Sequence, residues 1–184
     1  MSQAIGMIEL SSIGIGYEVE DAMLKASSVK LLIARTICSG KYVVVVGGEV
    51  ADVRSSVDAG LNICHEAVID HIVIPNVHES VFPSLSQAIP LTPQKIGALG
   101  IVETFTVSSI LLAADAAAKA ADVSLFRIHV AMAIGGKGFL NVIGDVSAVQ
   151  AAIEAAAQIA KQRGVLVSRV VIPAPRPELL SEYI

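Results

Sequence analysis

The feature that most constrains this chain is an internal repeat. Residues 4–9 (AIGMIE) return as residues 98–103 (ALGIVE), an offset of 94. Further along, matching residues lie 96 and finally 98 positions apart, as in Ile74-Pro75 and Ile172-Pro173. Gains of two residues at two loops are typical of duplicated domains. The sequence therefore predicts a tandem duplication of one domain.

The extent of the matches sets the domain boundaries. We predict a first domain over residues 3–78 and a second over residues 96–176, with a linker at 79–95 and a C-terminal tail at 177–184. The linker contains three prolines, which do not continue a helix. Each domain is thus expected to be a separate small fold.

Within each copy, the apolar pattern predicts the order strand, helix, strand, strand, helix, strand. In the first copy, Ser39-Gly40 separates two β-branched runs and indicates a hairpin. The second helix shows apolar residues every three or four positions. The predicted elements of the first copy cover residues 5–10, 18–27, 29–38, 41–46, 50–64 and 68–74. This βαββαβ order matches the ferredoxin-like plan, so the fold class is α+β, present twice.

Composition narrows the class of protein further. Apolar residues make up 54% of the chain and charged residues 16%, which excludes intrinsic disorder. No apolar run approaches the roughly 20 residues of a membrane-spanning helix. The net charge of −4, spread without long charged runs, argues against a nucleic-acid binder, which would show a basic face. The first residues resemble no secretory signal, so we expect an intracellular protein that binds neither nucleic acid nor membrane.

Two glycine-rich segments could suggest ligand binding. Gly14-Ile15-Gly16 lacks the third glycine of a dinucleotide fingerprint and precedes acidic residues, so we interpret it as a turn. Gly135-Gly136-Lys137-Gly138 could cradle a phosphate, but its counterpart Ser39-Gly40-Lys41 lies between two strands, which favours a hairpin. A soluble ferredoxin-like ligand-binding protein or enzyme, with its site at that loop, stays as an alternative.

No catalytic constellation stands out in the sequence. The four histidines show no metal-ligand spacing, and no nucleophile–base pair is visible, so the chain is not expected to be an enzyme. Lys25 and Lys119 occupy matched helix positions, consistent with a solvated face or with contacts between assembled units. Cys38, at the first hairpin, is either a small buried apolar residue or a metal ligand; Cys64 is expected to be inert.

Both copies resemble bacterial microcompartment domains, the units of the protein shells that enclose metabolic organelles in the bacterial cytoplasm. The resemblance rests on residues 4–9, 21–29, 37–40, 48–50 and 73–75, with counterparts in the second copy and in the unpermuted order. It spans nearly the whole chain. It implies a structural shell protein whose partners are other shell proteins and two further copies of itself, because tandem members of this family form trimers that mimic a hexamer.

The resemblance also implies roles for particular residues. In this family a hairpin from each domain surrounds a central pore, which assigns the pore lining to Cys38, Ser39, Gly40, Ile134, Gly135 and Gly136. It places Lys25 and Lys119 at the edge where trimers meet. The family's edge segment Pro-Arg-Pro-His stands here as PNVH at 75–78 and PAPR at 173–176, so its arginine is lost in both copies.

The segment at 36–41 (TICSGK) is similar to the pore segment of tandem shell proteins of the propanediol-utilisation type. In that type, the cysteine that matches Cys38 binds a [4Fe–4S] cluster on the threefold axis. The resemblance therefore implies one cluster per trimer, electron transport across the shell, and an encapsulated or cytosolic redox protein as a further partner. Ser39 replaces the usual proline. A metabolite pore without a cluster stays as the alternative.

Overall fold

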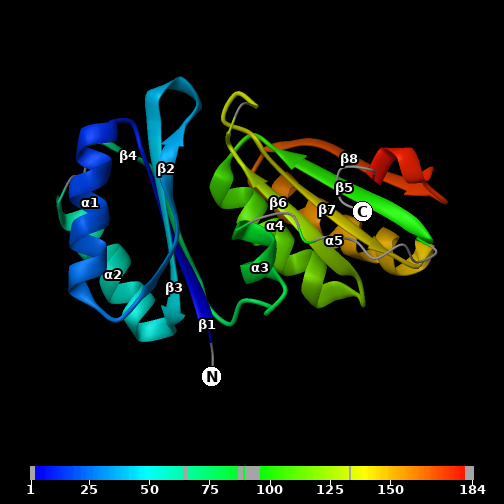
Figure 1. Ribbon diagram of the computed structural model, residues 1–184, viewed down its shortest axis with the longest axis horizontal. Coiled ribbons are helices and arrows are strands. Elements are labelled where there is room, and N and C mark those ends of the chain that lie inside the picture. The colour runs from blue at the N-terminus through cyan, green and yellow to red at the C-terminus, as the bar shows by residue number, and fades with distance from the viewer. Residues whose placement is uncertain (1–2, 64–65, 87–88, 90–95, 133, 181–184) are drawn as a thin grey trace. The chain divides into compact units, whose positions relative to one another are not determined.

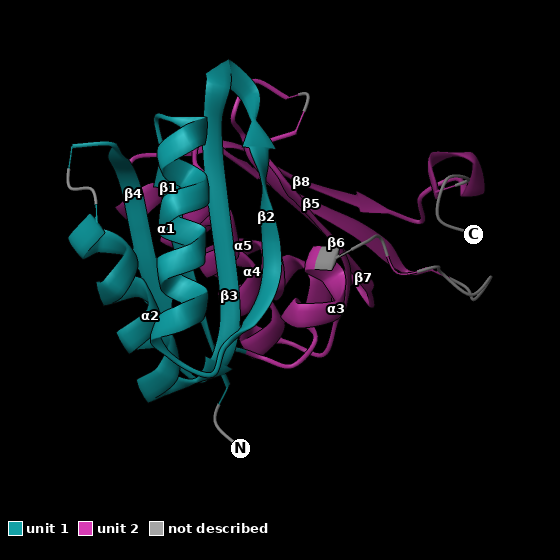
Figure 2. Ribbon diagram, turned by 60° about the vertical axis from the view of Figure 1, so that its left-hand side comes forward, with its two compact units in different colours: residues 1–77 teal, residues 78–184 magenta. Residues whose placement is uncertain are grey.

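The computed structural model describes residues 3–63, 66–86, 89, 96–132 and 134–180. Cys64, much of the expected linker and the last four residues lie outside that part. The chain divides into two compact units, Met1–Val77 and His78–Ile184 (Figure 2). Residues 78–86, which the sequence assigned to the end of the first domain and the linker, belong to the second unit.

The first unit is one antiparallel sheet with two helices on one face (Figure 1). Its strands follow the order β2-β3-β1-β4, so the first and third strands are central. The elements are β1 (Gln3–Leu10), α1 (Ile13–Ala26), β2 (Lys30–Ile37), a three-residue 3-10 turn (Cys38–Gly40), β3 (Lys41–Glu49), α2 (Val50–Ile63) and β4 (Val68–Ile74).

The second unit repeats this arrangement and adds a short helix before it. Its sheet order, β6-β7-β5-β8, is the same topology with every pair antiparallel. The elements are α3 (Val81–Ser86), β5 (Ala98–Thr104), α4 (Val107–Ala120), β6 (Ser124–Val130), β7 (Gly138–Gly144), α5 (Val146–Gln162), β8 (Leu166–Pro173) and a 3-10 turn (Pro177–Leu180). The predicted fold class, two α+β domains of βαββαβ order, is confirmed. No described helix is long and apolar enough to cross a membrane.

The interpretation of Gly14-Ile15-Gly16 as a turn is wrong, because both glycines lie inside α1. The Ser12 hydroxyl caps the helix by accepting from the Ile15 amide at 3.5 Å, so the helix begins at Ile13. Gly16 lies against Tyr42 of β3, and a Cβ atom there would be 2.5 Å from the ring carbon Cγ. Glycine is therefore needed at this position for close packing of helix on sheet.

The second unit makes the same helix–sheet contact with the bulky residue on the other side. The counterparts of Gly16 and Tyr42 are Ile110 on α4 and Gly138 at the start of β7. A Cβ atom on Gly138 would lie 2.5 Å from Cγ2 of Ile110. The two repeats thus place the glycine on opposite sides of one helix–sheet contact, and in each the bulky partner fills the space that the glycine leaves.

Candidate functional site

The first hairpin joins β2 to β3 through Cys38, Ser39 and Gly40, and Ile37 faces Lys41 at the ends of the strands. Ser39 and Gly40 both have left-handed backbone angles, with φ of 66° and 71°. Such angles suit glycine and are costly for serine. Cys38 is half-buried, whereas Ser39 and Gly40 are exposed. The predicted hairpin is confirmed, with Cys38 as the first residue of its turn.

The second hairpin, between β6 and β7, is two residues longer. Five residues separate the paired Thr36 and Tyr42 in the first unit, whereas seven separate Val130 from Gly138, which pair in the second. Residue 133 lies outside the described part. Counted from β7, the counterpart of Cys38 is Ile134, as expected, but counted from β6 it is Met132. Because the second loop is longer, Cys38 has two possible counterparts in the second unit and not the single one that the sequence predicted.

Left-handed residues also shape this longer loop. Gly135 and Gly136 have φ of 68° and 83°, and Ala131 has φ of 53°. The Ala131 amide donates to the Lys137 carbonyl at 3.0 Å, which closes the loop at its base. Ile134 and Gly136 are half-buried and Gly135 is exposed. The loop lies between two strands, as the hairpin interpretation predicted.

An ion pair stands at the base of the first hairpin, between neighbouring strands. The Lys41 ammonium lies 2.9 Å from Glu9 Oε1, and the Glu9 side chain on β1 is only 4% exposed. A buried carboxylate requires such a partner. This pair ties the start of β3, next to the turn, to the central strand of the sheet.

The second unit reproduces this pair with greater exposure. Lys137 donates to Glu103 Oε1 at 2.7 Å, and the Ser168 hydroxyl donates to Glu103 Oε2 at 3.2 Å. The Lys137 ammonium is therefore occupied by a carboxylate, which weakens the alternative of a phosphate site at this loop. Glu9 and Glu103 were not predicted from the sequence, although the same acidic residue recurs in an apolar strand of both repeats.

Three side chains pack together beside the second hairpin. The His129 ring stacks on Phe139, with centroids 5.0 Å apart and planes at 16°, and the Arg127 guanidinium lies 5.1 Å from the Phe139 centroid. His129 Nε2 lies 2.7 Å from the Met132 carbonyl oxygen. A carbonyl only accepts, so this nitrogen carries a proton and anchors the loop to β6.

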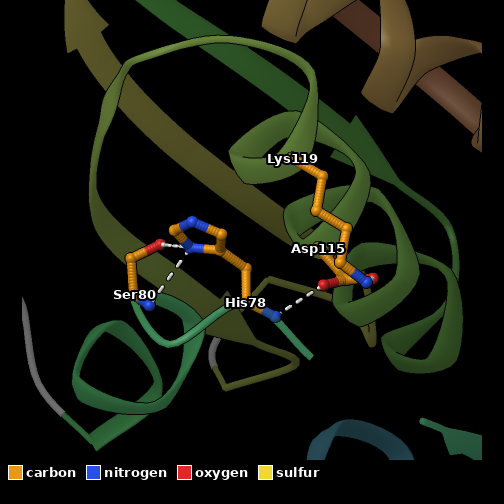
Figure 3. Close-up of polar contacts among 4 residues, drawn as sticks. All are labelled: His78, Ser80, Asp115 and Lys119. Atoms are coloured by element: carbon orange, nitrogen blue, oxygen red, sulfur yellow. Dashed lines mark hydrogen bonds and ion pairs between the residues drawn. The ribbon is translucent and has the colours of Figure 1, made fainter. Parts of the chain in front are cut away.

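The two lysines assigned to the assembly edge each pair with an aspartate one helical turn earlier. Lys25 lies 2.5 Å from Asp21 and Lys119 lies 2.6 Å from Asp115. Their surroundings differ: Asp21 is 61% exposed, whereas Asp115 is 12% exposed. Asp115 also accepts from the His78 amide at 2.8 Å (Figure 3).

A metal ion or cluster is held by several ligands at once. Among the described residues, no group of three or more His, Cys, Asp and Glu converges in a way that could hold a metal ion. Iron–sulfur clusters are held by about four cysteine thiolates. A cluster at Cys38 would therefore require the same residue from several copies of the chain.

Comparison with known proteins identifies the family. The BMC domain matches residues 4–77 and again residues 98–175. The chain belongs to the BMC-domain family. It is 42% identical to the bacterial microcompartment shell protein PduT of Citrobacter freundii, over 100% of this chain and 99% of that protein. The carboxysome assembly protein CcmO of a Synechocystis strain is 33% identical over 92% of this chain, which spans 61% of CcmO.

A solved structure agrees with this assignment. A microcompartments protein from Desulfitobacterium hafniense DCB superposes with a TM-score of 0.93, at 46% identity, covering 97% of this chain and 98% of that one. The tandem shell-protein family expected from the sequence is therefore confirmed. The two relatives are a microcompartment shell protein and a carboxysome assembly protein, so the expected structural role and localisation are confirmed.

Proposed function

We propose that this BMC-domain shell protein forms a trimeric, pseudo-hexameric tile whose two kinds of hairpin alternate around a central pore. Two similar domains per chain and threefold closure make six quasi-equivalent positions. The repeated sheet topology, with a hairpin at the same place in each unit, supports this arrangement. The pore would be lined by Cys38, Ser39 and Gly40 from one hairpin and by Ile134, Gly135 and Gly136 from the other.

We further propose that Cys38 from three copies holds one [4Fe–4S] cluster. Three symmetry-related thiolates are enough for three of the four irons. The observation that carries this proposal is the position of Cys38, half-buried as the first residue of a tight turn at the end of two paired strands. Bound there, the cluster would supply one-electron transfer between the two sides of the shell.

The neighbouring residues fit this group. Ser39 and Gly40 follow the thiol in a tight turn, which places backbone N–H groups beside it in sequence. Such donors stabilise and tune a thiolate-bound centre. Ile134 on the longer hairpin contributes an apolar side chain rather than a competing ligand. An open metabolite pore with three thiols remains the alternative, since the same loop would also line a channel.

Iron analysis of anaerobically purified protein tests the cluster. Wild-type trimer, of about 57 kDa from three chains of 19.1 kDa, is expected to bind about four irons and to absorb visible light. Cys38→Ser is expected to keep the trimer and lose both signals. The matched control, Ile134→Ser on the other hairpin, should retain both. Equal iron in wild type and Cys38→Ser would overturn the cluster and leave the open pore.

The edge lysines belong to the same proposal. Lys25 and Lys119 are exposed at matched helix positions, and we propose that they contact neighbouring trimers or other shell proteins. Replacing both with aspartate is expected to leave trimers intact in sedimentation while sheets disappear from electron micrographs. Lys161→Asp, at an exposed lysine on α5, provides the control. Unchanged sheets in the double variant would show that the two lysines are merely solvated.

A further inference from the structure

The segment that leaves the first repeat has a defined conformation. Asn76 turns the chain with a left-handed φ of 53°. Two residues later, the His78 carbonyl accepts from the Val81 amide at 3.0 Å, which starts the short helix α3. The His78 ring also contacts the Ser80 hydroxyl, at 2.8 Å from Nδ1 (Figure 3). We call residues 76–81 the first exit segment.

The segment that leaves the second repeat, residues 174–179, is built in the same way. Ala174 has a left-handed φ of 44°. The Arg176 carbonyl accepts from the Leu179 amide at 3.0 Å, and the Arg176 side chain contacts Glu178, at 3.1 Å. Each of these residues lies 98 positions after its counterpart in the first exit segment. We call residues 174–179 the second exit segment.

The first exit segment docks on helix α4. The His78 amide donates to Asp115 Oδ1 at 2.8 Å, while Lys119 holds Oδ2 of the same carboxylate at 2.6 Å. Val81, at the start of α3, is fully buried, and α3 contacts α4. The carboxylate of Asp115 is thereby shielded from solvent and bound by two donors.

The matching surface of α1 is open. Asp21 is 61% exposed, and within the described residues its carboxylate is paired with Lys25. Around it, α1 exposes apolar side chains whose counterparts on α4, Val107, Leu111 and Ala118, are buried; these are Ile13 at 38%, Tyr17 at 62% and Leu24 at 39%. The second exit segment likewise exposes Leu179 at 56%, whereas its counterpart Val81 is buried. Apolar side chains are therefore exposed both on α1 and on the second exit segment, whereas their counterparts on α4 and in the first exit segment are buried.

We propose that the second exit segment of one copy covers helix α1 of the next copy, with Arg176 placed at Asp21. The contact reproduces, between chains, the one that His78 makes with Asp115 inside the chain. In that contact the donor is the His78 backbone amide, so the Arg176 amide takes its place at Asp21, and the arginine side chain adds a permanent positive charge close to the carboxylate. This inference rests on the proposed trimer, in which three such contacts close the ring.

Charge exchange tests the contact, with the concentration at which half of the trimer dissociates as the readout. Asp21→Arg and Arg176→Asp are each expected to raise it at least about tenfold, since coupling between close interfacial charges exceeds 1.4 kcal/mol. The double variant restores opposite charges and should return within about threefold of wild type. Asp58→Arg, at an exposed carboxylate on α2, serves as the control.

The possible results distinguish a failure of the contact between Arg176 and Asp21 from a failure of the proposed trimer. A monomeric wild type would overturn the trimer itself. A wild-type trimer that both single exchanges leave unchanged, or a double variant weaker than either single one, would overturn the contact alone. Leu179→Asp, at a side chain already exposed in the single chain, gives an independent measurement and should weaken the trimer without lowering the helical content. Trimers unaffected by Leu179→Asp would also contradict the contact.

Discussion

Helices α1 and α4 hold the same place in their repeats and have 14 residues each, but α4 buries ten of them and α1 buries three. Their sequences follow this difference. Glu20 on α1, for example, is replaced by the buried Ala114 on α4. Charged side chains are rarely buried without a partner, so a buried helix face loses them. The two repeats therefore share one backbone topology, whereas the side chains of each helix match the burial of that helix.

The exchanged packing pair offers the largest test of this comparison. Gly16→Ile forces a side chain into the Tyr42 ring and is expected to cost about 3 kcal/mol in the free energy of unfolding. Adding Tyr42→Gly copies the second repeat, so the double variant should lose clearly less than the sum of its single changes. Urea denaturation at one fixed protein concentration measures both.

Gly14→Ala, on the same helix, is the matched control. No atom lies within 4 Å of a Cβ at Gly14, so alanine should be neutral or stabilise by up to about 1 kcal/mol through helix propensity. If the losses in free energy of unfolding at Gly16 and Tyr42 were strictly additive, the two residues would not be coupled, and the packing of the second repeat would not be an alternative to that of the first.

The hairpin ion pairs predict an unequal response in the two units. Lys41→Ala leaves Glu9 buried without its partner and is expected to cost about 3 kcal/mol. Lys137→Ala leaves Glu103, 28% exposed and still bonded to Ser168, and should cost about 1 kcal/mol. Equal losses, measured by urea denaturation, would contradict the role assigned to burial.

A smaller difference is expected at the two helix aspartates. Asp115→Ala removes an acceptor for the His78 amide and for Lys119, and should cost about 2 kcal/mol. Asp21→Ala removes one exposed pair and should cost less than about 0.5 kcal/mol in dilute, unassembled protein. A comparable loss for both variants would show that the exit segment adds nothing to α4.

The smallest expected effect concerns the acid of the second exit segment. The Arg176 side chain donates hydrogen bonds to Glu178 and holds the pKa of that carboxyl below its ordinary value. Arg176→Ala should raise the pKa again. Because the folded pKa is lowered, this contact favours folding above the ordinary pKa and is lost as pH falls through the folded one. An NMR titration that shows no change in the variant would exclude the contact in solution.

Much of the fold could be predicted because its signals lie within short stretches of sequence and occur in both repeats. The Ser39-Gly40 turn and the apolar rhythm of α2 are signals within a few residues, and the repeat showed that both domains share one topology. The start of α1 was missed because a glycine inside a helix looks like a turn until the ring of Tyr42, 26 residues later, is seen beside it. Helix α3 was missed because Pro83, which lies in its first turn, and the prolines that follow it suggested a linker.

The residue order alone determined the duplication, the α+β class and the hairpin that contains Cys38, since these depend on neighbours in sequence or on comparison of the copies. Only the tertiary structure decided which charges are buried. Glu9 and Lys41 are 32 residues apart and meet because β1 and β3 pair in one register. Asp21 and Asp115 look identical in sequence, and only the packing of a distant exit segment makes one a solvated side chain and the other a buried acceptor.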